Sequence, residues 1–317
     1  MNRIIIFILA ALAAAGCGNR KAEQFTALPF PDIAVPGMID TPQDRAEYMA
    51  EHFWDGLTDP ERGFPCDSLL VSGVKRGEVE QKYANWLQIL DMNRPDVAEK
   101  AVKRLYDRAL ACERHDSTSN VFEAFMGLAD KYLHNVNSPL RNEEYYLHYA
   151  SRLSGYEGLS PEEKDRYAYH VQMCSLNRIG TKAADFRFAD RTGRMHILYG
   201  IDAPLTLLFF SNPGCEACMN IINMLKENPA VSQMVARGSL AVLNIYIDED
   251  IQAWRDYMPV YPEEWYNGFD PDMVIRMDNL YNVRAIPSLY LLDKEKRVIL
   301  KDAPEDKVLS VLTGMRL

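Results

Sequence analysis

The sequence predicts an all-α N-terminal domain followed by an α/β C-terminal domain, in which helices flank a mixed central sheet. Apolar residues recur at helical spacing between residues 41 and 178. After Gly180 the pattern changes to short apolar or alternating segments of strand length. The chain has 317 residues, 48% of them apolar and 25% charged, which is enough for two packed cores. We therefore expect domains over 41–178 and 179–317.

Residues 1–16 have the form of a signal peptide. A short positive start at Asn2-Arg3 precedes an uninterrupted apolar run from Ile4 to Ala15, and Gly16-Cys17 follows it. A run of this length is too short to span roughly 30 Å of hydrocarbon as a helix that rises about 1.5 Å per residue. We expect the run to be cleaved and not to remain as a membrane anchor.

The end of this segment, Leu12-Ala-Ala-Ala-Gly-Cys17, resembles the lipobox of bacterial lipoproteins, although Ala14 stands where that pattern prefers a larger aliphatic residue. The resemblance implies lipidation of Cys17, stable membrane attachment through several acyl chains, and a tether over 17–40. No Asp comes directly after Cys17, which by resemblance to lipoprotein sorting favours the outer membrane, with the protein facing the periplasm in the cell envelope. The alternative is ordinary cleavage after Ala13-x-Ala15, which would leave a soluble periplasmic protein with a free Cys17 thiol.

Proline content separates the tether from the helical domain. Prolines 29, 31, 36 and 42 each remove a backbone donor, so residues 25–42 should be irregular.

Ser160-Pro161-x-Glu163 is a capping box with proline at the first helical position, so a helix should begin there. Single apolar stripes predict earlier helices, in a bundle of five or six, over 82–92, 98–112, 122–133 and 146–153.

Strand-like segments of the C-terminal domain surround a Cys-x-x-Cys motif. Asp185–Phe188 and Met195–Leu198 flank a turn and predict a hairpin. Leu205–Phe210 is apolar over a strand's length, as expected for a strand buried on both faces, and it leads through four residues into Cys215-Glu-Ala-Cys218. A helix over Met219–Lys226 comes next. Further strands are predicted at Ala241–Ile247, Ser288–Leu292 and Arg297–Lys301, and a closing helix at Asp306–Leu312.

The strand-Cys-x-x-Cys-helix unit, together with Val283-Arg-Ala-Ile-Pro287-Ser-Leu-Tyr-Leu-Leu-Asp293, resembles the thioredoxin superfamily. The likeness covers roughly residues 178–317 and is to its exported TlpA-like and ResA-like thiol-disulfide oxidoreductases. It implies that Cys215 is the attacking thiol, Cys218 the resolving thiol and Pro287 a cis-proline, with Ile286 just before it. The helical region is similar to a domain of unknown function that precedes such modules in bacterial lipoproteins.

The start of a helix suits the chemistry of this cysteine pair. A thiolate is the attacking species in disulfide exchange, and a free cysteine of pKa about 8.5 is only slightly ionised at neutral pH. If Cys215 lies where a helix begins near Glu216, unpaired N–H groups and the helix dipole stabilise its anion. Cys218, one turn further, can resolve a mixed disulfide. A cis peptide before Pro287 would turn Ala285–Ile286 toward Cys215, where it can pair with an extended substrate.

Residues around the motif depart from the usual family pattern. Phe209 occupies the strand position, six before the first cysteine, that holds a buried acid in many thioredoxins, so no carboxylate on that strand can accept a proton. Gly214 replaces a Trp and Ala217 replaces a Pro, so the family's redox potential does not transfer. Glu216 places a negative charge beside the attacking thiol, which would raise its pKa and favour a reductant.

These features predict a membrane-anchored thiol-disulfide oxidoreductase, a reductase or isomerase, that acts on exported protein thiols and disulfides and receives electrons from an upstream donor. We expect no cofactor beyond the redox-active Cys215–Cys218 disulfide, and no metal, because a zinc site needs four ligands and no second cysteine pair is present. The net charge of -10, spread along the chain, argues against nucleic acid as a partner. The alternative is a ligand- or partner-binding lipoprotein whose thioredoxin-like module is redox-inactive.

The remaining cysteines and the aromatic residues of the insertion leave alternatives open. Cys112 and Cys174 lie on apolar helical stripes, where cysteine usually belongs to the core. Cys66 lies in a loop and could pair with one of them in an oxidising compartment. A group of aromatic residues in the insertion after the second central strand either faces substrate above the active site or packs beneath a loop: Trp254, Tyr261 and Trp265.

Overall fold

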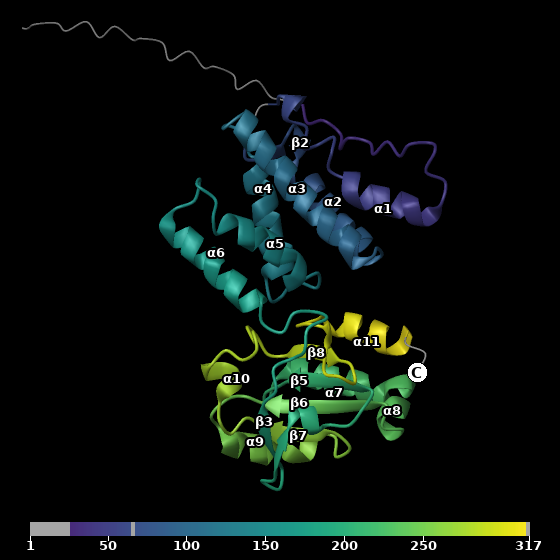
Figure 1. Ribbon diagram of the computed structural model, residues 1–317, viewed down its shortest axis with the longest axis vertical. Helices are drawn as coiled ribbons and strands as arrows, with labels where there is room; N and C mark the ends of the chain where they lie inside the picture. The colour runs from purple at the N-terminus through teal and green to yellow at the C-terminus, as the bar shows by residue number, and fades with distance from the viewer. Residues whose placement is uncertain (1–25, 65–66, 315–317) are drawn as a thin grey trace, which may run out of the picture.

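The computed structural model describes residues 26–64 and 67–314, which form two domains with separate apolar cores. Figure 1 shows the helices of the N-terminal domain gathered above a sheet that carries helices on its faces. The proposed signal peptide and Cys17 lie outside the described residues, as does Cys66. In the part of the chain that the structure describes, no helix is long and apolar enough to cross a membrane.

The N-terminal domain is a helical bundle, as predicted. Its helices are longer than the apolar stripes indicated because their exposed ends carry no periodic signal. The capping box of Ser160 and Glu163 is present at the start of the last helix. The bundle comprises α1 (Pro42–His52), α2 (Arg76–Asp91), α3 (Pro95–His115), α4 (Val121–Ala129), the π-helical turn η2 (Asp130–His134), α5 (Glu143–Leu153) and α6 (Pro161–Cys174), with the 3₁₀ turn η1 (Pro60–Arg62) before α2.

A small hairpin corrects the prediction that this domain is entirely helical. β1 (Leu70–Val71) pairs antiparallel with β2 (Val74–Lys75). Ser72 and Gly73 between them both have positive φ, 48° and 79°, which matches the twist of a two-residue hairpin turn. Strands of two residues carry too little alternation to be detected in the sequence.

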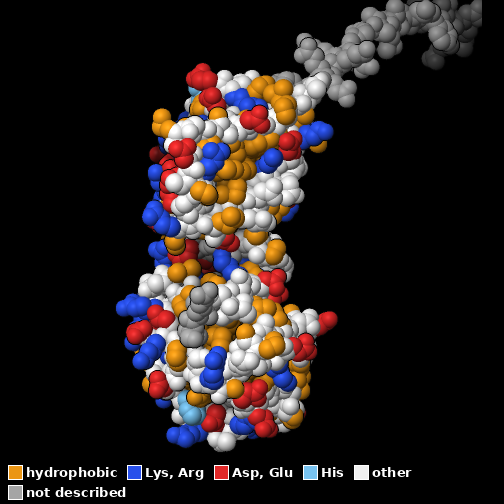
Figure 2. Space-filling model, turned by 90° about the vertical axis from the view of Figure 1, so that its right-hand side faces the viewer, with side chains coloured by type: hydrophobic (Ala, Val, Ile, Leu, Met, Phe, Trp, Pro, Cys, Tyr) orange, Lys and Arg blue, Asp and Glu red, His pale blue; other side chains and the backbone are white. Residues whose placement is uncertain are grey.

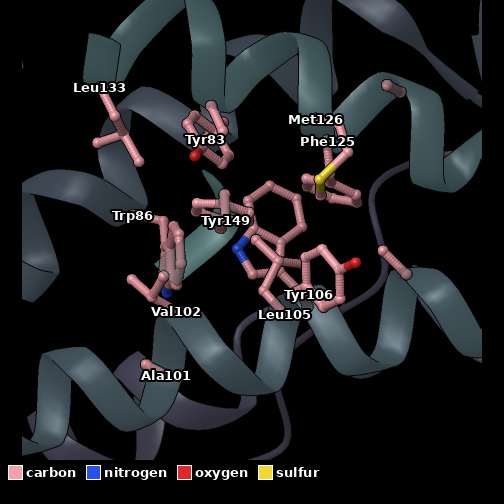
Figure 3. Packing of buried hydrophobic residues seen from close by; sticks show 14 of the residues in the cluster. Tyr83, Trp86, Ala101, Val102, Leu105, Tyr106, Phe125, Met126, Leu133 and Tyr149 are labelled. Atoms are coloured by element: carbon pink, nitrogen blue, oxygen red, sulfur yellow. The ribbon is translucent and has the colours of Figure 1, made fainter. Parts of the chain in front are cut away.

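Aromatic side chains fill the centre of the helical core (Figure 3). Tyr83 and Trp86 from α2, Phe125 from α4 and Tyr149 from α5 are all fully buried. The indole N–H of Trp86 donates to the carbonyl of Ala50 at 2.8 Å, so its burial leaves no donor without a partner. Burial of this many large side chains gives the bundle a core of its own, separate from that of the sheet domain.

The C-terminal domain is built on a mixed sheet, as predicted, and this sheet has seven strands. β5 pairs in parallel with β6 and antiparallel with β8, so the strand that leads to the cysteine motif lies near the centre. Both central strands are buried along their whole length, which explains their continuous apolar runs. The sheet order is β4 (Met195–Ile197), β3 (Arg187–Asp190), β7 (Tyr266–Phe269), β6 (Leu240–Tyr246), β5 (Leu205–Phe210), β8 (Ser288–Leu292) and β9 (Val298–Leu300).

Different elements cover the two faces of the sheet. One face is covered by α7 (Glu216–Glu227), α8 (Pro229–Ala236) and α11 (Glu305–Gly314). The opposite face packs against apolar residues of the segments next to β3 and before β8. The smaller elements are η3 (Leu198–Gly200), α9 (Ile251–Tyr257), η4 (Met258–Val260) and α10 (Val274–Met277).

The insertion between β6 and β8 contributes a strand that the sequence did not reveal. β7 pairs in parallel with β6 and antiparallel with β3, so it joins the N-terminal hairpin of the domain to the sheet. The aromatic residues of the insertion are buried in the core around α7, which settles their role as packing and not as a substrate-facing wall: Trp254, Tyr261 and Trp265.

Candidate redox site

Cys215 lies where β5 passes into α7. The turn after β5 includes Gly214 with φ of +71°, a conformation that favours glycine, and Cys215 then serves as the N-cap of α7. The backbone N–H of Cys218 donates to the Cys215 sulfur at 3.2 Å. One of the unpaired donors at the start of the helix is therefore directed at the sulfur that would carry the negative charge in the reduced protein.

Cys215 and Cys218 form a disulfide, with their Cα atoms 5.2 Å apart. Their exposure differs: Cys215 is half-buried, whereas the Cys218 side chain is 1% exposed and belongs to the core beneath α7. A disulfide of another protein can therefore reach the first sulfur and not the second. This asymmetry is the one that disulfide exchange needs between an attacking and a resolving thiol.

Helix α7 is fixed against the sheet by one apolar face. Cys218, Ile221, Ile222 and Leu225 follow helical spacing and are all buried. Glu216 lies in the first turn and is exposed, where a negative charge interacts favourably with the helix dipole. The same charge lies beside Cys215, so it stabilises the helix and opposes a thiolate at its N-cap.

The loop before β8 brings a proline to the cysteine turn. The Ile286–Pro287 peptide bond is cis. Ser288, directly after it, pairs with Phe210 at the end of β5, so Pro287 lies beside the segment that leads to Cys215. Ile286 is half-buried and packs against the same core cluster as Cys215.

No buried acid lies on β5, the strand that leads to the cysteine motif, and the buried polar side chains on β6 and β7 are uncharged. Phe209 is fully buried and is aligned with Asn244 of β6. Asn244 interacts with Ser211 and donates to Asn267 at 3.0 Å, and all three side chains are buried. Sequence reasoning missed this row of polar side chains, although a lone Asn within the apolar Ala241–Ile247 segment was a signal for it.

The other described cysteines lie in the helical domain, away from this site. Cys112 and Cys174 are free and buried, as predicted from their helical stripes. Burial raises the pKa of the Cys112 thiol to about 11 and that of the Cys174 thiol to about 12. Both are therefore protonated and unreactive in the folded protein.

No group of three His, Cys, Asp or Glu side chains within 26–64 and 67–314 has the arrangement of a metal site. His134 and His170 lie close together, with ring centroids 4.2 Å apart. They belong to a network between helices in which Tyr146 bonds to Asp130 at 2.7 Å and to His170 at 2.8 Å. This network stabilises the turn after α4.

Comparison with known proteins separates the same two regions. A family model described as a domain of unknown function (DUF5106) matches residues 15–177, and a thioredoxin-like model matches residues 204–298. The crystal structure of a thioredoxin-like protein from Bacteroides caccae is 35% identical, with a TM-score of 0.78 over 92% of this chain and 100% of that one. The chain belongs to the thioredoxin-like family. The family and the helical domain of unknown function, both expected from resemblance, are thereby confirmed.

Shorter solved structures match less than half of this thioredoxin-like protein. The C-terminal domain of an uncharacterized protein from Bacteroides fragilis is 46% identical, with a TM-score of 0.42, over 43% of this chain and 98% of that one. The thioredoxin domain of a thiol-disulfide oxidoreductase from Bacteroides vulgatus is 18% identical, with a TM-score of 0.38, over 43% and 96%. The comparison with curated proteins returned no match.

Proposed function

We propose that this thioredoxin-like protein is a thiol-disulfide oxidoreductase that reduces or isomerises disulfides of exported proteins. The observation that supports this most directly is the Cys215–Cys218 disulfide at the start of α7, with one accessible sulfur and one buried sulfur. A structural disulfide has no need for that asymmetry at a helix N-terminus. Disulfide exchange requires it, because the attacking thiol must be reached from outside and the resolving thiol must stay behind it.

The reaction starts from the reduced pair. The Cys215 thiolate attacks one sulfur of a client disulfide, the client S–S bond breaks, and one client sulfur leaves as a thiolate. The Cys218 thiolate then attacks the Cys215 sulfur, which re-forms the internal disulfide and releases the second client thiolate. Two electrons pass to the client, and a dithiol donor must return them by reducing Cys215–Cys218. In isomerisation, a client thiol releases Cys215 instead, and no net electrons are transferred.

The loop before β8 is the place where a client would lie. Its cis peptide at Ile286–Pro287 borders the cysteine turn, where the backbone of the loop could pair with an extended client segment as an added strand. Ile286 and Pro287 are thus assigned to client binding. Glu216 is assigned to adjusting the redox equilibrium of the pair.

Reduction of insulin disulfides by dithiothreitol, followed by turbidity, tests the proposal. The wild-type protein should accelerate it, Cys215→Ser should abolish the acceleration, and Cys218→Ala should accumulate a mixed disulfide with client through Cys215. Wild-type activity equal to that of Cys215→Ser would instead favour a binding lipoprotein with a redox-inactive module. When Cys218→Ala is expressed in cells, the client trapped on Cys215 can be released by reductant and identified by mass spectrometry.

The protein's anchoring belongs to the same proposal and is supported by the lipobox resemblance at Cys17. Lipidation there would hold the redox domain at the envelope, facing the periplasm, at the outer membrane. Radioactive palmitate should label the wild-type protein in cells and should not label Cys17→Ala. Fractionation should then move the variant from the membrane to the soluble periplasmic fraction.

A further inference from the structure

The helical domain contains a cavity of about 530 Å³ that has no part in the proposed redox reaction. Every residue that lines it lies between residues 71 and 167, so the sheet domain contributes none of them. Apolar side chains make up most of the lining, and Phe122, Ala124 and Met126 of α4 are among those that are buried. Binding sites for small molecules are typically cavities of roughly 300–1,000 Å³ with a mostly apolar lining. The size and lining of this cavity are therefore those of a small-molecule site.

Gly127, inside α4, leaves the cavity open. Glycine within a helix is less favourable than alanine, because its backbone loses more freedom on folding. A Cβ at this position would meet no atom within 4 Å, so close packing does not require a glycine. The helical backbone of α4 does not require one either, since other residues adopt that conformation readily. The missing side chain instead keeps space free against the helix backbone, as a ligand that lies across α4 would need.

Two aromatic rings form a wall of the cavity. The ring centroids of Phe122 and Tyr156 lie 5.1 Å apart. Gly158 allows Tyr156 to take this position, because a Cβ at Gly158 would lie 2.6 Å from the Tyr156 ring. Aromatic faces attract organic cations through the ring quadrupole, most strongly where water is excluded. The wall therefore suits an apolar or a cationic ligand.

Acidic side chains outnumber basic ones in the lining by two. Glu80 forms an ion pair with Lys131 at 2.5 Å, and Asp130 accepts hydrogen bonds from two tyrosine hydroxyls. Arg76 donates to a backbone carbonyl at 3.2 Å. An excess of negative charge favours a cation over an anion as the ligand. The charged side chains that line the cavity are Arg76, Glu80, Glu113, Glu123, Asp130 and Lys131.

Glu113, near the end of α3, is the acid best placed to receive a cationic group. Burial, together with the Glu113 carboxylate beside it, raises the pKa of Tyr156 to about 12, so the tyrosine hydroxyl keeps its proton. The Oε2 atom of Glu113 is itself buried and has no hydrogen-bond partner among residues 26–64 and 67–314. A buried carboxylate oxygen is costly to leave without a donor. An ammonium or guanidinium group would supply one.

Other residues fix the domain that holds the cavity to the redox domain. Glu143, in the first turn of α5, accepts a hydrogen bond from the Asn282 side chain at 2.6 Å and forms an ion pair with Lys301 at 2.9 Å. Lys301 also donates to the carbonyls of Cys174 and Leu176. Figure 2 shows acidic and basic side chains gathered at the constriction between the two domains. None of these five residues lines the cavity, so substitutions in the cavity leave the contact between the domains in place.

We propose that this cavity binds a small organic cation, whose apolar body lies against Phe122 and the backbone of α4 at Gly127 and whose ammonium or guanidinium group donates to Glu113. The buried Oε2 atom of Glu113 decides between a cation and a neutral ligand. The inference goes beyond the redox function and does not depend on it, because the cavity and the cysteine pair lie in different domains. The helical domain thus has a ligand-binding role of its own.

Titration calorimetry of the full chain with three probes of similar shape tests this inference: 4-phenylbutylamine, 4-phenylbutanol and 4-phenylbutyrate. All three carry the same phenyl and alkyl body, and only the amine is a cation at neutral pH. The amine should bind about tenfold more tightly than the alcohol, as expected for one hydrogen bond to a charged group, and more tightly still than the carboxylate. Affinity of the alcohol or the carboxylate equal to that of the amine, or no binding of the amine, would overturn the inference.

Two substitutions locate the site. Glu113→Gln should lower the affinity for the amine to that for the alcohol, and Glu162→Gln, which alters an exposed acid outside the cavity, is its matched control. Gly127→Leu should fill the cavity and abolish binding of both probes. Its control is Gly77→Leu, because Gly77 also lies in a helix with no atom within 4 Å of its Cβ position but does not line the cavity. Wild-type affinity for the amine in Gly127→Leu would overturn the inference.

Folding and redox activity are measured separately from binding. Thermal unfolding shows whether each variant folds, and Gly127→Leu should be at least as stable as the wild-type protein, since leucine favours a helix more than glycine does. Cys215→Ser should bind the amine as the wild-type protein does. Loss of amine binding alongside normal insulin reduction would overturn this inference alone. Absence of insulin reduction alongside normal amine binding would overturn the proposed function alone.

Discussion

The backbone N–H of Cys218 points at the sulfur of Cys215 across 3.2 Å, inside the first turn of α7. In the proposed reaction, the donor belongs to the resolving residue and the acceptor is the sulfur that attacks. When the disulfide is reduced, this contact can stabilise the Cys215 thiolate as a charge-assisted hydrogen bond. One helix turn would therefore supply both the stabilisation of the nucleophile and the group that later displaces the client.

Native alkylation should distinguish the cysteines of the described region. In the reduced, folded protein iodoacetamide should label Cys215 first and Cys218 more slowly, because only the first is accessible. Cys112 and Cys174 should be labelled only after denaturation, since burial keeps both thiols protonated. Peptide mapping by mass spectrometry gives the order. Rapid labelling of Cys174 in native protein would contradict this packing.

Glu216→Gln should make the redox pair more oxidising. Removing the negative charge beside Cys215 stabilises the thiolate and hence the reduced form. Repulsion between two like charges about 4 Å apart in a water-like dielectric is worth about 1 kcal/mol, so the equilibrium with glutathione should shift up to fivefold toward the dithiol. Glu227→Gln, at the opposite end of α7, is the matched control and should leave it unchanged. A shift toward the disulfide would contradict the predicted direction.

Acidification should destabilise the helical domain through His134. Burial, together with the charges of Arg284 and His170, lowers the pKa of His134 to about 3. Below about pH 6.5 the unfolded chain binds a proton that the folded protein does not, so stability falls as the pH drops toward 3. The urea concentration at the midpoint of unfolding should therefore change less between pH 7.5 and pH 5 in His134→Gln than in the wild-type protein.

Some acid sensitivity should persist in that variant, because burial also lowers the pKa of His148 and His170. His115→Gln provides the control, since His115 is exposed at the end of α3. If His115→Gln and His134→Gln reduced the acid sensitivity of unfolding equally, burial of His134 would not be the cause of that sensitivity.

Lys301→Met should weaken the attachment between the domains. The substitution leaves Glu143 with fewer partners and two carbonyls without their donor, a loss of about 3–5 kcal/mol for a broken buried pair. Lys307→Met removes an exposed interdomain ion pair with Asp91 and should cost about 1 kcal/mol or less. Scanning calorimetry should show a large loss of stability, with the domains unfolding separately, for the first variant alone.

Gly268→Ala should disturb the sheet between β3 and β7. A Cβ at this position would lie 2.6 Å from the Phe188 ring and 2.8 Å from the carbonyl oxygen of Ala189. The backbone carbonyl cannot move aside as a flexible side chain can, so we expect the free energy of unfolding to fall by about 1–3 kcal/mol. Denaturant unfolding measures it. Unchanged stability would show that β3 and β7 are less closely packed than described.

The local pattern of apolar residues predicted the strands beside the cysteine motif more accurately than the strand in the insertion. The strands Leu205–Phe210 and Ser288–Leu292 have the predicted bounds, because continuous burial makes their apolar runs distinct. β7 escaped detection because Asn267 and Gly268 interrupt its apolar character. Both residues are explained by long-range contacts, Asn267 with Asn244 and Gly268 with Ala189.

Sequence by itself determined the two-domain organisation, the strand-motif-helix unit and the position of the cysteine pair at a helix start, since all three depend on spacing within one stretch of chain. Only the tertiary structure decided that Glu143 meets Asn282, 139 residues away, and that α6 encloses a cavity beside Ile286. In the sequence Glu143 looks like any acid in the first turn of a helix. Its role arises because two independent cores pack together and bury its carboxylate among the partners that compensate it.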